Sequence, residues 1–247
     1  MTGSKRYLVL DGIRGFAFLN MVIYHAVWDC VYLFGFDWQW YQSEGAYIWQ
    51  QYICWTFILL SGFCQPLGQK KLKRGICVLL AGFMISAVTW IVMPEACVRF
   101  GILTLIGSCM LLMIPMERFL KKCSPPAGAI ISLVLFILTR NINSGHLGFG
   151  EWNLLELPSV LYQNLATAYL GFPGPEFSST DYFSLLPWGF LFVFGYFLYQ
   201  LFAQREWLRH LEPGRLKPLE WLGRHTLGLY LIHQPVLYLL LFLLFSQ

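Results

Sequence analysis

Four ionisable side chains lie within one apolar stretch near the start of the chain. They are Asp11, Arg14, His25 and Asp29. Because an ionisable group is costly to insert in a membrane-length helix, such residues indicate a functional site. The side-chain types suggest two kinds of chemistry: the histidine can accept and release a proton, and the arginine can bind an anion such as a phosphate.

The spacing of these residues separates the two kinds of chemistry. At 1.5 Å rise per residue, Arg14 and His25 lie about 16 Å apart along a helix, so each is close to a different membrane face. His25 and Asp29 are four residues apart and share one helix face. A carboxylate there fixes the imidazole tautomer and stabilises the imidazolium, as a general base requires. Asp11 and Arg14 have a second interpretation, in which they only neutralise each other at a helix end.

The composition is that of an integral membrane protein. Of the 247 residues, 57% are hydrophobic and only 12% are charged, and the mean hydropathy is +0.56. Soluble domains carry about 25% charged residues. The length predicts one transmembrane domain over residues 1–247. The net charge of +4 does not indicate nucleic acid. The seven cysteines contain no CxxC pair, and we expect no metal site.

The apolar segments predict a helical bundle of about seven membrane spans, each judged against the ~20 residues that a bilayer needs. The basic loops alternate with acidic ones, so the positive-inside rule places the N-terminus in the cytoplasm. A break at Pro235 is expected to kink the last span. The expected spans are 7–28, 46–66, 75–93, 101–118, 127–139, 185–202 and 219–245, with basic loops at 70–74, 118–122 and 205–217.

The segment 152–172 is semi-apolar but does not fit this pattern as a span. It contains Glu156, Pro158 and Asn164. An eighth span there would reverse the side of everything that follows. We therefore expect it to be re-entrant or to lie at the interface over the outer mouth of the bundle.

Several other polar residues are candidates for a site, each with a structural alternative. Arg224 lies on the same predicted side as Arg14, where loop lysines also follow from topology alone. Arg99 can pair with Glu95 one turn away. Asp181 can be a helix N-terminal acid. His233, two residues before Pro235, can be a buried hydrogen-bonded histidine or a ligand-binding one.

The chain resembles a known family in four stretches. The opening stretch, residues 6–29, reads RYLVLDGIRGF and ends in YHAVWD. The others are RFGIL at 99–103, the block 170–188 that includes DYF and PW, and LGRHTLGLYLIHQP at 222–235. Together they resemble the bacterial proteins grouped with the catalytic domain of heparan-α-glucosaminide N-acetyltransferase, within the transmembrane acyltransferase superfamily. Thr104 and Ser184 depart from that pattern, because histidine and proline are expected there.

The resemblance implies an enzyme that takes an acyl group from cytoplasmic acyl-CoA, usually acetyl-CoA. The acceptor would be a sugar or another small molecule on the extracytoplasmic side, and the location a bacterial cytoplasmic membrane. Membrane lipids and a second copy of the chain are further expected partners. Carried over by position, Arg14 would contact the CoA phosphates and His25 would be the catalytic histidine, as general base or acyl carrier. The other expected roles are orientation of His25 by Asp29, positioning of the guanidinium by Asp11, donor binding by Arg224, and a substrate tunnel lined by Arg99, Asp181, Trp188 and His233.

Two alternatives from other classes stay open at this point. A transporter or lipid-binding protein would use the same polar residues as a permeation path. It should show internal repeats or paired broken helices, and the sequence shows only the break at Pro235. A structural subunit would use its buried charges for assembly, so His25→Ala would harm expression rather than activity.

Overall fold

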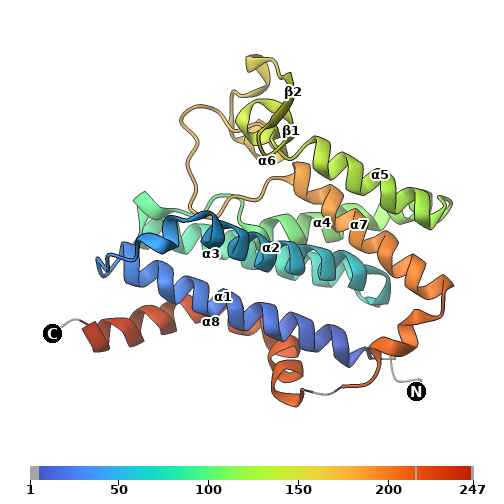
Figure 1. The fold of residues 1–247 in the computed structure, drawn as a ribbon, viewed down its shortest axis with the longest axis horizontal. Helices are drawn as coiled ribbons and strands as arrows, with labels where there is room; N and C mark the ends of the chain where they lie inside the picture. Colours follow the sequence, from blue (N-terminus) through green and yellow to red (C-terminus); the bar gives the residue numbers. More distant parts are fainter. Residues whose placement is uncertain (1–5, 215, 246–247) are drawn as a thin grey trace. The chain divides into compact units, whose positions relative to one another are not determined.

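The computed structural model describes residues 6–214 and 216–245, and this part of the chain is mainly helical (Figure 1). A two-stranded antiparallel sheet is the only strand structure in the described ranges. The helices are α1 (Leu8–Tyr32), α2 (Glu44–Cys64), α3 (Lys71–Val92), α4 (Ile102–Leu120), α5 (Pro125–Leu138), α6 (Leu165–Leu170), α7 (Leu185–Gln204) and α8 (Lys217–Phe245), and the strands are β1 (His146–Phe149) and β2 (Trp152–Glu156).

Within the described residues, five helical segments are long and apolar enough to cross a membrane: Lys71–Val92, Ile102–Leu120, Pro125–Ser144, Leu185–Gln204 and Lys217–Phe245. This confirms an all-α membrane protein. The helices α1 and α2 have 25 and 21 residues, also sufficient to span, but they are not among the five. Polar residues lower the hydropathy of both. The prediction that they span, which brings the number of spans to seven, stays a prediction.

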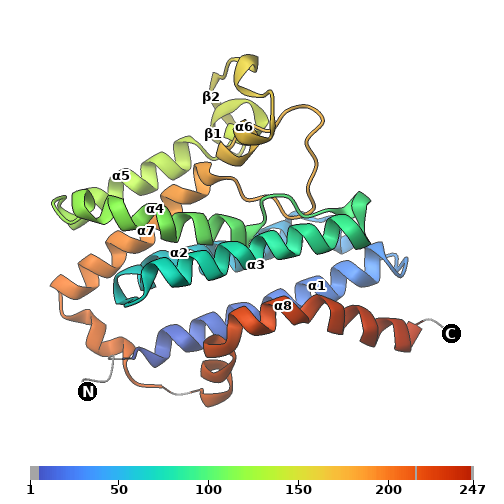
Figure 2. The same ribbon diagram turned by 180° about the vertical axis from the view of Figure 1, so that it is seen from behind.

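The described residues group into two compact units. The first holds residues up to Phe57 and from Ala203, and the second runs from Ile58 to Phe202. In the first unit α1 and α8 lie side by side, and in the second α3 packs along α4 (Figures 1 and 2). The prediction of one domain over the whole chain stays a prediction.

Small residues allow α1 and α8 to approach closely. A Cβ atom on Gly15 would collide with the backbone carbonyl of Leu219, and one on Gly223 with that of Asp11. Contacts of this kind let two helix backbones pack almost directly against each other, as in many membrane proteins. The two helices run in the same direction, so their N-terminal ends lie together (Figure 1).

In the second unit, α3 and α4 pack through glycines and an ion pair. A Cβ on Gly82 would meet Thr104. Glu117 of α4 is buried, and its carboxylate lies 2.5 Å from Nζ of Lys71 and 3.7 Å from Nζ of Lys121. Here the sequence-based boundary was wrong, because α3 begins at Lys71 and not at Gly75. Lysine and arginine are good helix formers, and the pairing with Glu117 stabilises the first turn.

The segment 152–172 forms no helix of membrane-spanning length. The strand β2 pairs with β1, and the short helix α6 follows, with Asn164 capping its N-terminus in a capping box. All residues of β2 are exposed. The prediction that this segment is not an eighth transmembrane helix is confirmed, and its location at a membrane surface stays a prediction.

Two further boundaries differ from the expected ones. α1 continues to Tyr32, four residues beyond the expected end, because no helix breaker follows Trp28. α8 begins at Lys217 and continues as one helix through Pro235.

Candidate active site

Two histidines meet where α1 packs against α8. The ring centroids of His25 and His233 lie 5.1 Å apart with the planes at 62°. Phe18 stands edge-on to His233 at 6.5 Å, and Tyr230 lies 5.1 Å from it. The sequence places these histidines more than 200 residues apart, and the parallel packing of the two helices brings them together.

The backbone fixes the tautomer of His233. Its Nδ1 lies 2.5 Å from the carbonyl oxygen of Tyr230. Because a carbonyl oxygen only accepts hydrogen bonds, Nδ1 carries the hydrogen of the neutral ring. The other nitrogen, Nε2, is then an acceptor with a free lone pair, and it is buried with no hydrogen-bond partner among the described residues.

Asp29 is fully buried beside this histidine pair, and its partner differs from the expected one. Its Oδ1 accepts a hydrogen bond of 2.5 Å from Nε2 of Gln234, and its Oδ2 has no partner within the described part of the chain. The hydrogen bond of Asp29 thus goes to Gln234, and the prediction that Asp29 orients His25 stays a prediction. A buried carboxylate needs a donor, and the amide of the facing helix supplies it.

Gln234 was missed by the sequence reasoning. The available signal was an amide in an apolar helix, between a histidine and a proline. Through Asp29 it joins α8 to α1 next to the two histidines. Four polar side chains from two helices therefore form this end of the site: His25 and Asp29 from α1, and His233 and Gln234 from α8.

The N-terminal end of α1 holds an arginine cluster. The carboxylate of Asp11, which is buried, accepts from Nε of Arg6 at 2.7 Å and lies 3.3 Å from Nη1 of Arg14. The side chain of Arg14 is 24% exposed. A carboxylate shared by two guanidinium groups leaves an excess positive charge.

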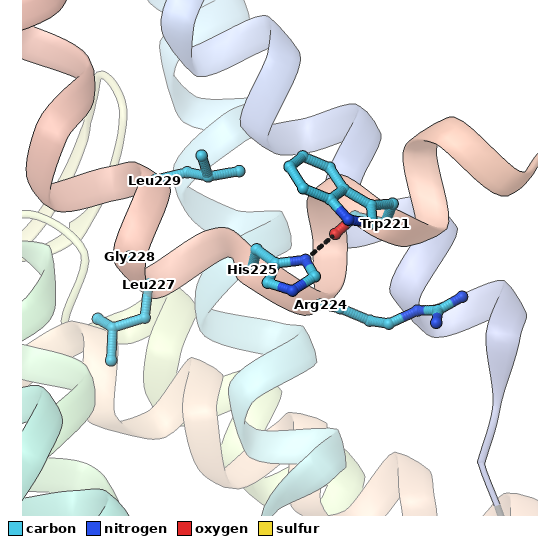
Figure 3. A pocket seen from close by; sticks show the side chains of 6 residues that line it. All are labelled: Trp221, Arg224, His225, Leu227, Gly228 and Leu229. Carbon is cyan, nitrogen blue, oxygen red and sulfur yellow. Dashed lines mark hydrogen bonds between the residues drawn. The ribbon is translucent and has the colours of Figure 1, made fainter.

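Arg224 of α8 lies near the same end of the helix pair. Its Nη2 is 3.8 Å from Oε2 of Glu220, and Oε1 of that buried carboxylate accepts from the backbone N–H of Leu216 at 3.1 Å. A shallow hollow of about 460 Å³ adjoins Arg224 (Figure 3). It is lined by Trp221, Arg224, His225, Leu227, Gly228 and Leu229.

An aromatic pair borders this hollow. The rings of Trp221 and His225 lie 4.6 Å apart at 37°, and Nδ1 of His225 is hydrogen-bonded to the Trp221 carbonyl at 2.9 Å. Figure 3 shows the two rings beside each other, with Arg224 extending from the same part of the helix. Aromatic faces next to a guanidinium suit a ligand that combines a flat ring with negative charge.

Asp181, in the second unit, is a helix N-terminal acid, but of α4 and not of the following helix α7. Its Oδ2 accepts from the backbone N–H of Ile102 at 3.2 Å. Burial raises the pKa of the Asp181 carboxyl to about 6, although the hydrogen bond from Ile102 acts in the opposite direction. The sequence could not identify the helix, because the contact joins residues 79 positions apart.

Arg99 and Trp188 also lie in the second unit. The backbone of Arg99 exchanges two hydrogen bonds with the hydroxyl of Ser179, and its guanidinium has no ion pair recorded in the described ranges. Trp188 is buried, with the guanidinium of Arg140 4.7 Å from its ring. These contacts account for Trp188 and Asp181 by packing and capping. That they line a tunnel stays a prediction.

The described residues contain no group of three His, Cys, Asp or Glu side chains able to hold a metal ion.

The fold and this site define a polytopic α-helical membrane protein with polar groups buried between two of its helices. The chain belongs to the family described as heparan-alpha-glucosaminide N-acetyltransferase, catalytic, whose model matches residues 6–235. The matched range includes every candidate site residue, and the description of the family names an acetyltransferase. Comparisons with curated proteins and with solved structures gave no match.

Proposed function

We propose that this protein transfers an acetyl or other acyl group from cytoplasmic acyl-CoA to a sugar or another small acceptor on the extracytoplasmic side of the membrane. The observation that carries the proposal is the division of the α1–α8 pair into an arginine end and a histidine end. Eleven residues separate Arg14 from His25 and nine separate Arg224 from His233, or about 16 Å and 14 Å of helix. Since α1 and α8 run in the same direction (Figure 1), the arginine ends of the two helices lie together, and so do their histidine ends.

The arginine end suits the phosphate groups of CoA. Guanidinium groups bind phosphate through charge-assisted, often bidentate, hydrogen bonds. Asp11 holds the guanidinium of Arg14 in place, and the hollow beside Arg224 offers ring faces next to a cation. The extended pantetheine arm of CoA would then run along the helix pair and present the thioester to the histidines.

His25 is the group that we assign to proton transfer. As a general base it would take the proton from the attacking hydroxyl or amine, which forms a bond to the thioester carbonyl carbon while the C–S bond breaks and CoA leaves as the thiol. As a nucleophile it would carry the acyl group on the ring before the acceptor takes it. Both routes need a path for the thioester that is protected from water.

The proposal is tested by measuring acetyl-CoA binding and acceptor-dependent CoA release with purified full-length protein in detergent. We expect Arg14→Ala to weaken acetyl-CoA binding about 10- to 100-fold, the value for a hydrogen bond to a charged group. His25→Ala should still bind acetyl-CoA but lose at least about 100-fold in turnover. Arg118→Ala, which removes an equal charge from α4 in the second unit, serves as the matched control and should bind normally.

Folded wild-type protein that binds neither acetyl-CoA nor longer acyl-CoA would overturn the donor assignment. A transporter or small-molecule-binding protein would then be the better interpretation. If His25→Ala were poorly expressed but fully active when purified, the structural-subunit interpretation would lead.

A further inference from the structure

Three buried hydrogen-bond acceptors at the histidine end have no donor among the described residues. They are Oδ2 of Asp29, Oε1 of Gln234 and, in the tautomer fixed by Tyr230, Nε2 of His233. Burial of a polar atom without a partner costs free energy, and few such atoms remain in native proteins. Three such atoms within one turn of the α1–α8 pair therefore indicate a hydrogen-bond donor that the two helices do not supply themselves.

All three atoms accept, and this decides the chemistry of that partner. The thioester of acyl-CoA offers its carbonyl oxygen and its sulfur here, which are acceptors and cannot satisfy them. An amine or a set of hydroxyl groups offers several N–H or O–H donors. A carboxylate among the acceptors also favours a partner with positive charge, such as an ammonium group.

The site has few internal ways to satisfy these atoms. Asp29 is fully buried, its other oxygen already accepts from Gln234, and the amide of Gln234 is held in orientation by that bond. The hydrogen on Nδ1 of His233 is committed to the Tyr230 carbonyl. The positions of the three acceptors are thus set by helix packing before any ligand arrives, which lowers the cost of binding.

We propose that Asp29, Gln234 and His233 form a binding subsite for the amino or hydroxyl-bearing group of the acyl acceptor. The identification of this ligand as the acyl acceptor rests on the proposed function. Asp29 and Gln234 bind the group through their free oxygens, and His233 accepts a third hydrogen bond through Nε2. The subsite lies next to His25, so a bound amine or hydroxyl is placed beside the group assigned to proton transfer.

The test separates acceptor binding from donor binding. The unfolding midpoint of the full-length protein in detergent is measured against glucosamine, glucose, choline and, separately, acetyl-CoA. Choline carries positive charge without N–H donors. Asp29→Asn places an amide where an acceptor oxygen stands, and Gln234→Met removes the amide at similar volume. The matched control is Gln65→Met, because Gln65 is also a buried amide with one recorded bond, from Nε2 to the Met110 carbonyl in the second unit.

For wild type we expect glucosamine to raise the midpoint at lower concentration than glucose, and choline to have less effect than either. Asp29→Asn and Gln234→Met should raise the half-saturating glucosamine concentration about 10- to 100-fold, as expected for loss of hydrogen bonds to a charged or buried group. Their half-saturating acetyl-CoA concentration should stay within about twofold of wild type, and Gln65→Met should respond to both ligands as wild type does.

Two results would overturn the proposal while the acyl-CoA assignment stands. One is an acetyl-CoA shift without any shift from glucosamine or glucose. The other is an equal glucosamine response in wild type and in both subsite variants, which would show that these atoms are satisfied by trapped water. A glucosamine shift that Asp29→Asn abolishes, in protein that ignores acyl-CoA, would instead support the subsite and contradict the proposed function.

Discussion

Two helix pairs of this protein are built in the same way but differ in the environment of one buried acid in each. Both α1–α8 and α3–α4 approach closely over glycines, at Gly223 in the first pair and Gly82 in the second. In α3–α4 the buried Glu117 has two lysine partners. In α1–α8 the buried Asp29 has one amide partner and one oxygen without a donor in the described ranges.

This difference distinguishes a carboxylate that stabilises the fold from a carboxylate that serves the function. A buried carboxylate that is neutralised and hydrogen-bonded stabilises the packing of its helices, and its removal leaves unpaired charges. A carboxylate left half-satisfied, beside two histidines, costs stability and is retained where a ligand completes it. We therefore expect substitutions at the α1–α8 site to reduce activity more than stability, and substitutions in α3–α4 to do the reverse.

The largest effect should come from His233→Asn. Asparagine keeps an amide donor for the Tyr230 carbonyl but has no hydrogen-bond acceptor at the position of Nε2, so the acyl acceptor should bind more weakly and acceptor-dependent release of CoA should fall up to about 100-fold. The unfolding midpoint should change little, because Nε2 of His233 accepts no hydrogen bond from the described part of the chain. Turnover close to wild type, measured with a thiol reagent at saturating acetyl-CoA, would remove His233 from the site.

The next effect concerns the close approach of α1 and α8. A Cβ on Gly223 would collide with the backbone carbonyl of Asp11, and a backbone moves less easily than a side chain. We expect Gly223→Ala to destabilise the protein by about 3 kcal/mol, the upper range for overpacking.

The matched control is Gly228→Ala in the same helix, where the added carbon has no neighbour within 4 Å among the described residues beyond the local helix backbone. Alanine has a higher helix propensity than glycine, so this variant should be neutral or more stable by up to about 1 kcal/mol. Chemical unfolding in mixed micelles measures both. Equal effects of the two substitutions would contradict the close packing of the helices.

The sequence predicted the elements better than the contacts between them. Apolar segments predicted every long helix, because the length and the hydropathy of a helix depend only on the residues within that segment. Polar residues in an apolar helix likewise indicated Arg14, His25 and His233 as candidates, and their roles stay predictions. The contact of Asp29 with Gln234 could not be inferred, since spacing within α1 pointed to His25, whereas the amide of Gln234 lies 205 positions away in another helix. The same holds for Asp181, whose type suggested a capping role but whose helix could not be inferred.

A smaller effect is expected in α3–α4 from Glu117→Gln. The substitution keeps the shape but removes the charge that pairs with Lys71 and Lys121. Breaking a fully buried pair costs about 3–5 kcal/mol, but Lys121 is largely exposed and Lys71 partly so. We therefore expect a loss of about 2 kcal/mol in unfolding free energy. CoA release per folded molecule should be unchanged. A loss of turnover without a loss of stability would contradict the assignment of this pair to support.

The smallest effect concerns Asp181 at the start of α4, which extends the comparison to a capping acid. Its pKa is raised to about 6 from an ordinary value of 3.8, mainly by burial. The folded state thus keeps this proton where the unfolded state has lost it, so the contribution of Asp181 to stability falls as the pH rises from about 4 to 6 and is constant above. Because the Asp181 residue is partly exposed, this change in stability is about 1–2 kcal/mol.

Asp181→Asn keeps an oxygen for the Ile102 N–H and has no proton to lose. The stability of wild type relative to this variant should therefore decrease between pH 4 and pH 7.5, as measured by unfolding midpoints in the same detergent. A difference that does not vary with pH would show that the carboxylate stays ionised in the folded protein, as a well-satisfied capping acid does.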